Sequence, residues 1–285
     1  MLLAIPPLAA EKMFEISGIP ITNSYINSTI ALALFVVFAF LIKQAVNKYY
    51  HSDKAPKGIL NFFESILEFL LVYIDNVTKD RKKTLKFLPI VGTLFLFILI
   101  SNWMGLIPGT GSIGIWQVHG GEVELIPLLR PANADLNMTL AMAVFAVIGS
   151  HIIGVAAIGF FKYANKFIKL GDLYRALISL SPIKILTAII EFFVGLIEIF
   201  SEAAKMVSLS LRLFGNIFAG EVLLTVLAGL IAFIAPLPFM GLELLVGAVQ
   251  ATVFAMLTLV YLTMATTEIQ GHEEHGPAEQ LTINN

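Results

Sequence analysis

Apolar segments long enough to cross a lipid bilayer dominate the sequence and limit the folds open to it. A helix needs about 20 apolar residues to cross roughly 30 Å of hydrocarbon, and four such segments run at 27–46, 85–107, 137–161 and 240–266. The chain is 58% hydrophobic and 13% charged, whereas a soluble domain carries about 25% charged residues. The sequence therefore predicts an all-α membrane protein.

A fifth apolar segment is longer than one perpendicular crossing requires. No proline occurs from Ile183 to Ala235, and these 53 residues would extend about 80 Å as one helix. Five charged residues in this segment are spaced seven positions apart: Lys184, Glu191, Glu198, Lys205 and Arg212. Because seven residues are nearly two helical turns, they form one stripe, and such a stripe cannot face lipid. We expect a strongly tilted helix that faces a polar partner; alternatively, its first part leaves the membrane as a solvated helix.

The segment 57–83, between the first two crossings, has a different pattern. Its apolar residues recur at helical spacing, while Glu64, Glu68 and Asp75 occupy other positions. This pattern predicts an amphipathic helix that lies at the membrane interface.

Lysine and arginine are distributed unevenly between the two sides of the predicted membrane domain. Residues 43–86 contain nine of them and 162–184 contain five, whereas the segments 1–26, 108–136 and 233–239 contain only Lys12 and Arg130. Since cytoplasmic loops are enriched in Lys and Arg, we expect five crossings with the N-terminus outside and the C-terminus in the cytoplasm. The expected single membrane domain has four parts: 1–26 outside, 27–182 with three crossings and the interfacial helix, 183–267 as a hairpin, and 268–285 as a cytoplasmic tail.

The last two crossings are joined by a turn around Ile234 to Met240, so they are expected to form an antiparallel hairpin. In such a hairpin, residues at equal depth have a nearly constant sum of positions. This relation places Arg212 level with Gln250, and Glu221 level with Glu243. Two polar layers are therefore predicted inside an apolar hairpin.

The residue types in these layers suit proton transfer around a fixed positive charge. Arginine stays protonated because its pKa is above about 12, whereas two facing glutamates can share a proton. Glu221 lies about 13 Å outward from Arg212 along the helix, and Glu198 about 21 Å inward.

Structural interpretations of the same residues stay open. Arg212 could form an ion pair within this chain, Glu221 with Glu243 could be a static hydrogen-bonded clamp, and Glu198 could be solvated near the cytoplasmic end. His151 is interpreted as a helix-packing residue. Gly215, Ala219 and Gly220 are typical of close helix approach in membranes.

Several stretches together resemble subunit a of the bacterial F-type ATP synthase. They are SLSLRLFGNIFAGE at Ser208 to Glu221, QATVFAMLTLVYLTMA in the last crossing, SNWMGLIPG at Ser101 to Gly109, and PANADLNMTLAMA at Pro131 to Ala143. The resemblance extends over most of the chain from about residue 85 onward. At the position of Glu243 some members of the family have a histidine with a glutamate partner, whereas both partners here are glutamates.

The resemblance implies an ion-conducting stator subunit that forms two offset half-channels against a ring of c subunits. Arg212 matches the family's membrane arginine, which separates the half-channels and faces the ring carboxylate. The outer half-channel is expected to use Asp135, Asn137, Asn216, Glu221, Glu243 and Gln250, and the inner one Glu198. The implied partners are the c-ring, the peripheral-stalk subunit b, other subunits of the complex and membrane lipid, in the bacterial inner membrane. The transported ion is a proton, with sodium left open.

Other function classes find less support in the residues. The chain has no cysteine, and its net charge of −2 gives no indication of a nucleic-acid partner. No GxxxxGK[ST] loop occurs, so we expect a non-catalytic subunit without ATP, cofactor or metal binding. The main alternative is a stand-alone secondary ion transporter, but such folds usually show paired repeats and helices broken near the midplane, and the sequence shows neither.

Overall fold

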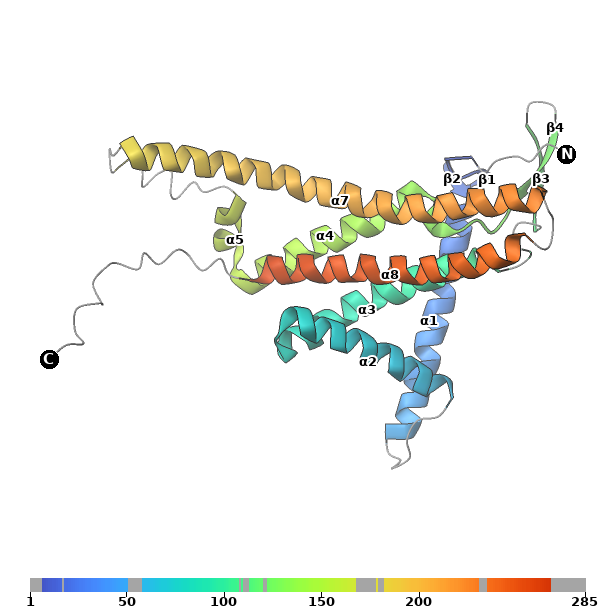
Figure 1. The fold of residues 1–285 in the computed structure, drawn as a ribbon, viewed down its shortest axis with the longest axis horizontal. Helices are drawn as coiled ribbons and strands as arrows, with labels where there is room; N and C mark the ends of the chain where they lie inside the picture. The colour runs from blue at the N-terminus through green and yellow to red at the C-terminus, as the bar shows by residue number, and fades with distance from the viewer. Residues whose placement is uncertain are drawn as a thin grey trace.

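The computed structural model describes residues 7–16, 18–50, 58–107, 109, 113–119, 122–167, 178, 182–230 and 235–267, and most of these residues are helical (Figure 1). The predicted cytoplasmic tail 268–285 lies outside the described residues. The longer helices are α1 (Asn23–Tyr50), α2 (Ile59–Thr78), α3 (Arg81–Met104), α4 (Leu136–Ile158), α7 (Pro182–Leu230) and α8 (Pro236–Thr266).

Five of these helices are long and apolar enough to cross a membrane, within the part of the chain that the structure describes. The candidate spans are Asn23–Asn47, Arg81–Met104, Leu136–Ile158, Ile185–Leu230 and Pro236–Thr266. They coincide with the five apolar segments of the sequence, and the interfacial segment forms α2, which is not among them. The predicted all-α membrane fold is therefore confirmed.

Helices α7 and α8 form the long antiparallel hairpin. Helix α7 is continuous over 49 residues, and α8 runs back beside it in the opposite direction, while α1 crosses the direction of the pair steeply (Figure 1). The continuity of α7 follows from its composition, since neither proline nor a run of glycines interrupts it.

The junction between α2 and α3 shows why one predicted helix is shorter than expected. Helix α2 ends at Thr78 because Lys79 adopts a left-handed backbone conformation with φ of 51°. Asp80 then begins the next helix, since its carboxylate accepts a hydrogen bond from the backbone N–H of Lys82 at 2.9 Å. The basic residues after Asp80 therefore belong to α3 rather than to the interfacial helix.

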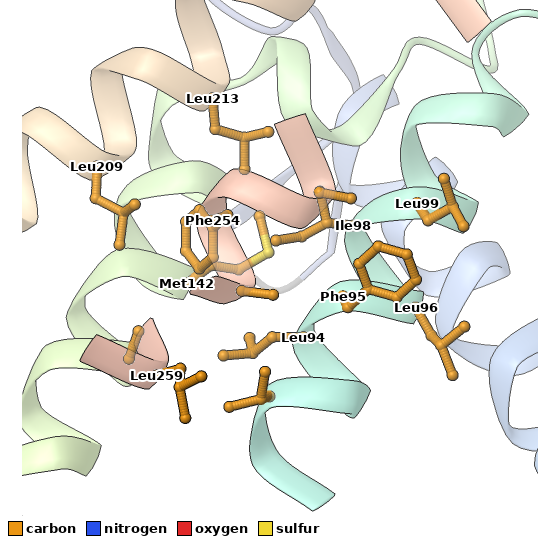
Figure 2. Close-up of a cluster of buried hydrophobic side chains, with 14 of the residues drawn as sticks. Leu94, Phe95, Leu96, Ile98, Leu99, Met142, Leu209, Leu213, Phe254 and Leu259 are labelled. Atoms are coloured by element: carbon orange, nitrogen blue, oxygen red, sulfur yellow. The ribbon is translucent and has the colours of Figure 1, made fainter. Parts of the chain in front are cut away.

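The core lies where α3, α4, α7 and α8 meet (Figure 2). Helix α7 contributes one narrow face to this core, with Leu209 and Leu213 buried at 1% and 0% exposure. Phe254 of α8 and Met142 of α4 pack against the same cluster. Because lipid is as apolar as these side chains, close van der Waals packing holds the helices together. Much of the remaining surface of α7 is exposed, including Leu196, Ile197, Phe200, Val207 and Leu211.

The loops contain short elements that the sequence pattern did not predict. Two antiparallel hairpins pair β1 (Lys12–Ile16) with β2 (Ile19–Thr22), and β3 (Gly114–His119) with β4 (Glu122–Pro127). A 3-10 turn, η2 (Ala132–Ala134), precedes α4. A short helix, α5 (Phe160–Phe167), follows Gly159, whose φ of 96° ends α4.

Candidate functional site

Arg212 lies on an exposed side of α7, beside the face that packs into the core. Its side chain is exposed, and it forms no hydrogen bond or ion pair with any residue that the structure describes. Its neighbours along the chain show the change of face, because Leu211 is 49% exposed whereas Leu213 is fully buried. The alternative interpretation, an ion pair with an acid of this chain, thus finds no partner among the described residues.

Small exposed residues flank Arg212 along the same face of α7. Ala204, Ser208, Gly215 and Ala219 are all exposed and recur at helical spacing. A β-carbon added at Gly215 would have no described atom within 4 Å. The side chains around Arg212 on this face are therefore short, which allows the backbone of another helix to approach closely.

The polar residues of α8 contact α7 at positions next to those predicted: Gln250 is hydrogen-bonded to Asn216 rather than to Arg212, and Glu243 lies against Gly220. Gln250 is 3% exposed, and its Oε1 accepts a hydrogen bond of 2.7 Å from Nδ2 of Asn216, one helical turn outward from Arg212. The carboxyl group of Glu243 lies against Gly220, so that a β-carbon added at Gly220 would overlap it. Asn216, Gln250 and Glu243 therefore lie along the α7–α8 interface, on the outward side of Arg212.

Glu221 has a charged partner that the sequence reasoning missed. Arg130 is 2% exposed, and its Nε donates to Oε1 and Oε2 of Glu221 at 3.0 and 3.2 Å, while its Nη2 donates to Oε2 at 3.1 Å. The sequence pattern gave Arg130 no role beyond that of a cation in an external loop. A signal for the pair existed, because a glutamate in an apolar helix requires a partner and the segments predicted to lie outside contain only two cations.

The N-terminal segment completes the environment of Arg130. The guanidinium donates to the backbone carbonyl of Pro7 at 2.8 Å and to that of Ala9 at 3.1 Å. Asn23, at the start of α1, joins the same region by donating to the carboxylate of Glu11 and to the carbonyl of Pro127. The predicted external segment is thus packed against the end of the hairpin that contains Glu221.

Asp135 and Asn137 begin α4 in this region. Asp135 is 9% exposed, and its carboxylate accepts a hydrogen bond of 2.9 Å from the backbone N–H of Asn137, which makes it the N-cap of the helix. The Asn137 side chain is exposed. One turn further, the hydroxyl groups of Thr139 and Ser210 are 3.2 Å apart and link α4 to α7.

Buried polar atoms without a hydrogen-bond partner gather on the outward side of Arg212. Among the described residues they are Ser24 Oγ, Asn27 Oδ1, Ser101 Oγ, Asn133 Oδ1 and Gln250 Nε2. Asn102 of α3 joins η2 to α8 in this region, since its side chain accepts a hydrogen bond from Asn133 at 2.6 Å and donates one to the carbonyl of Gly247 at 3.1 Å. Buried polar groups usually have partners, and those that lack a protein partner are where bound water is expected.

On the inward side, Glu198 is half-buried on α7. One turn further along α7, Glu202 lies among His151 of α4, Lys205 of α7 and Tyr163 of α5, and these contacts were not predicted. Burial, Glu202 and Glu198, in that order, raise the pKa of the Tyr163 hydroxyl to about 12. The negative charges of Glu202 and Glu198 therefore both disfavour ionisation of the Tyr163 hydroxyl group, which lies on α5 outside the crossing helices.

Known proteins resemble this chain over most of its length. A family model described as "ATP synthase A chain" matches residues 25–263. "ATP synthase subunit a" of Mycobacterium ulcerans is 32% identical over 254 residues, which cover 88% of this chain and 89% of the relative. The protein of the same name from Campylobacter jejuni is 34% identical over 217 residues, which cover 76% of this chain and 80% of the relative.

Proposed function

This chain belongs to the ATP synthase A chain family, whose members are proton-translocating, non-catalytic stator subunits of the F-type ATP synthase. We propose that it forms two offset half-channels against a c-ring. Arg212 separates the half-channels and faces the carboxylate of each passing ring subunit. The observation that carries this proposal is the position of Arg212: exposed, without a partner among the described residues, and flanked by small side chains on α7.

The charge of Arg212 explains how such a separation would work. A guanidinium cannot give up its proton under physiological conditions, so it cannot pass a proton from one half-channel to the other. It favours the ionised form of a nearby carboxyl group, and a protonated carboxyl group of the ring would therefore release its proton, and become a carboxylate, before it passes. Placing an arginine in a bilayer costs about 2.5–3.5 kcal/mol on insertion scales, and a carboxylate partner on the ring offsets this.

The outer half-channel is supported by the polar groups on one side of Arg212. Asn216 and Gln250 are joined by a hydrogen bond, Glu243 and Glu221 lie further outward, and the buried atoms without partners lie in the same half of the molecule. We assign Asp135 and Asn137 to the entrance beside the first turn of α4. On the other side, Glu198 belongs to the inner half-channel.

The proposed partners follow from this arrangement. The face of α7 with small side chains around Arg212 fits the helices of a c-ring. Other stator subunits such as subunit b would contact the remaining surfaces. The complex would lie in the bacterial inner membrane. Each proton crossing 100 mV releases about 2.3 kcal/mol, which rotation of the ring would transmit to ATP synthesis. Ring residues would largely decide whether the ion is a proton or sodium.

Reconstitution tests this function against that of a stand-alone transporter. The purified chain in liposomes should show no proton flux above that of empty liposomes, because half of each path is formed by the ring. The complete membrane sector, reconstituted at the same protein density, should conduct protons under an imposed potential. Substantial flux by the chain alone would favour the transporter and contradict the proposal.

A large residue at Gly215 tests the docking face. Gly215→Leu should leave the isolated chain as stable as the wild type, since Gly215 is exposed and nothing described lies within 4 Å of the new β-carbon. It should prevent association with the ring or stop ATP-driven proton pumping, because the bulk would hold the ring helix away from Arg212. Gly149→Leu is the matched control, since Gly149 of α4 is equally free of close neighbours; equal effects of both variants would argue against this face.

A further inference from the structure

A cluster of polar side chains joins four helices on the inward side of Arg212. We name it the inner cluster: His151 of α4, Tyr163 of α5, Glu202 and Lys205 of α7, and Tyr261 of α8. Lys205 Nζ is 2.6 Å from Glu202 Oε1 and 5.5 Å from the ring centre of Tyr261. Glu202 Oε2 is 3.6 Å from His151 Nε2, and His151 Nδ1 is 2.6 Å from the Tyr163 hydroxyl.

The position of Glu202 on α7 relates it to Arg212. The two residues are ten positions apart, about 15 Å along the helix axis. The angle between them around the helix is about 80°, so Glu202 faces α4 and α5 while Arg212 lies on an exposed side of α7. Glu198 lies between these directions, about 40° from Arg212. The carboxylates of Glu198 and Glu202 thus lie at successive positions around α7, from its exposed side toward the space between α7, α4 and α5.

A cavity of about 280 Å³ lies beside the cluster. His151, Tyr163 and Glu202 border it, together with apolar side chains that include Phe160 and Ile199. The volume is large enough for several water molecules at about 30 Å³ each, although apolar atoms form nearly all of its exposed lining, so water would find hydrogen-bond partners only at the three polar side chains. The cavity therefore offers a place where a proton can move between the cluster and water.

The hydrogen bonds of His151 allow it to take up and release a proton. The Tyr163 hydroxyl keeps its hydrogen at physiological pH, because its pKa is raised to about 12. A hydroxyl can either donate or accept, so the contact with Nδ1 is compatible with both neutral forms of the imidazole and with imidazolium. A shift of less than about 1 Å would bring His151 Nε2 and Glu202 Oε2 to hydrogen-bond distance.

From this geometry we infer that Glu202 and His151 form the proton-exchange pair of the inner half-channel. The inference rests on the proposed function and names the residues that complete its inner path. A proton released by the ring carboxyl group binds the Glu202 carboxylate, with Glu198 nearer the ring. The O–H bond formed on Glu202 breaks as His151 Nε2 takes the proton. The imidazolium then loses a proton to water in the cavity, which restores the carboxylate and the neutral imidazole without any transfer of electrons.

The charged groups around Glu202 support such an exchange. Lys205 and His151 face its carboxylate, Tyr163 lies behind the imidazole, and Glu198 is one helical turn away on α7. From α8, Tyr261 contributes an aromatic ring to Lys205 rather than a charge. If the cluster only clamped α5 to α4 and α7, the same contacts would exist, so the experiment must measure proton flow as well as stability.

The first experiment measures passive proton flow through the assembled membrane sector. Glu202→Gln should lower the flow about 100-fold, the lower end of the effect of removing a general acid–base group. His151→Gln should also lower the flow, because the group that takes the proton from Glu202 is then absent. Glu64→Gln, at an exposed position on α2, is the control and should conduct like the wild type. Wild-type flow in Glu202→Gln would overturn the inference and leave the cluster as a structural clamp.

The second experiment leaves Glu202 and His151 intact. The chain contains no cysteine, so Ile199→Cys places a single thiol of this chain at the cavity wall. A small thiol-specific reagent added from the cytoplasmic side should react there and block proton flow. Ile152→Cys is the control, because Ile152 follows His151 on α4 but is 64% exposed and does not line the cavity. Modification of Ile199→Cys without loss of flow would contradict the inference, even if Glu202→Gln failed to assemble.

These outcomes are distinguishable from failure of the proposed function. If the chain conducted alone in liposomes, the rotary assignment would be wrong whatever the cluster does. If conduction needed the ring but was unaffected by Glu202→Gln and by the reagent at residue 199, only the inner exchange pair would be wrong.

Discussion

Arg212→Ala in the assembled complex is expected to abolish ATP-driven proton pumping and to increase passive proton leak. Removing one partner of a desolvated ion pair costs about 3–5 kcal/mol, which corresponds to a decrease in the pumping rate of roughly 100-fold to 4,000-fold at about 1.4 kcal/mol for each tenfold change. Pumping is lost because the ring carboxylate would no longer be held ionised as it passes. Leak increases because the fixed charge between the half-channels is gone.

The two readouts must be made on the same preparation. Acidification of inverted vesicles measures pumping, and decay of an imposed pH gradient after removal of the soluble sector measures leak. The isolated chain should keep its stability, since Arg212 has no partner among the described residues. Arg81→Ala is the control, because Arg81 is also an exposed cation but pairs with Asp75 beside the α2–α3 junction. Normal pumping by Arg212→Ala would end the proposed mechanism.

Much of the helical architecture was predictable because the membrane imposes it. Each crossing must satisfy its own backbone hydrogen bonds and present apolar side chains to lipid, so the apolar segments and the long uninterrupted α7 follow from local sequence. The end of α2 did not follow in the same way, because it depends on the left-handed conformation of Lys79. The two β-hairpins depend on pairings across loops that no apolar periodicity marks.

Contacts between distant polar residues were the least predictable part of the site. Glu221 and Glu243 could be placed at similar depth, because both lie on helices of one hairpin. Arg130 comes from a loop 91 residues before Glu221, and no spacing rule connects the two. Glu202 was passed over for a related reason, since it lies outside the seven-residue stripe and contacts His151 of α4, 51 residues earlier.

The number of available cations still limited the possible partners of Glu221. Of the two in the segments predicted to lie outside, Lys12 is exposed and forms an ion pair with Glu15. Arg130 stands directly before the stretch that opens α4, which the fold brings against α7. A search of the sequence for the counter-ion of each intramembrane carboxylate would therefore have reduced the candidates for Glu221 to Lys12 and Arg130, and the fold decides between them.

The Arg130–Glu221 pair should behave as a unit in a double-mutant cycle. Arg130→Gln alone leaves a carboxylate without its counter-ion and two carbonyls of the N-terminal segment without their donor, so we expect a loss of about 3–5 kcal/mol of stability. Glu221→Gln alone leaves the buried guanidinium unpaired and should cost a similar amount. The double variant should recover about 2–3 kcal/mol, since neighbouring charges couple by up to roughly that amount.

Proton flow should follow a different pattern from stability across this cycle, and that difference separates the two roles of the pair. Glu221→Gln should lower the flow at least about 100-fold, the lower end of the effect of removing a general acid–base group, and Arg130→Gln should lower it as well, because Glu221 then lacks the partner that positions its carboxyl group. The double variant should regain stability but not flow, since the carboxyl group that exchanges the proton is absent from it. Lys12→Gln is the control and should change neither quantity. Recovery of both quantities in the double variant would make the pair purely structural, whereas additive losses of stability would show that Arg130 and Glu221 do not interact in the assembled complex.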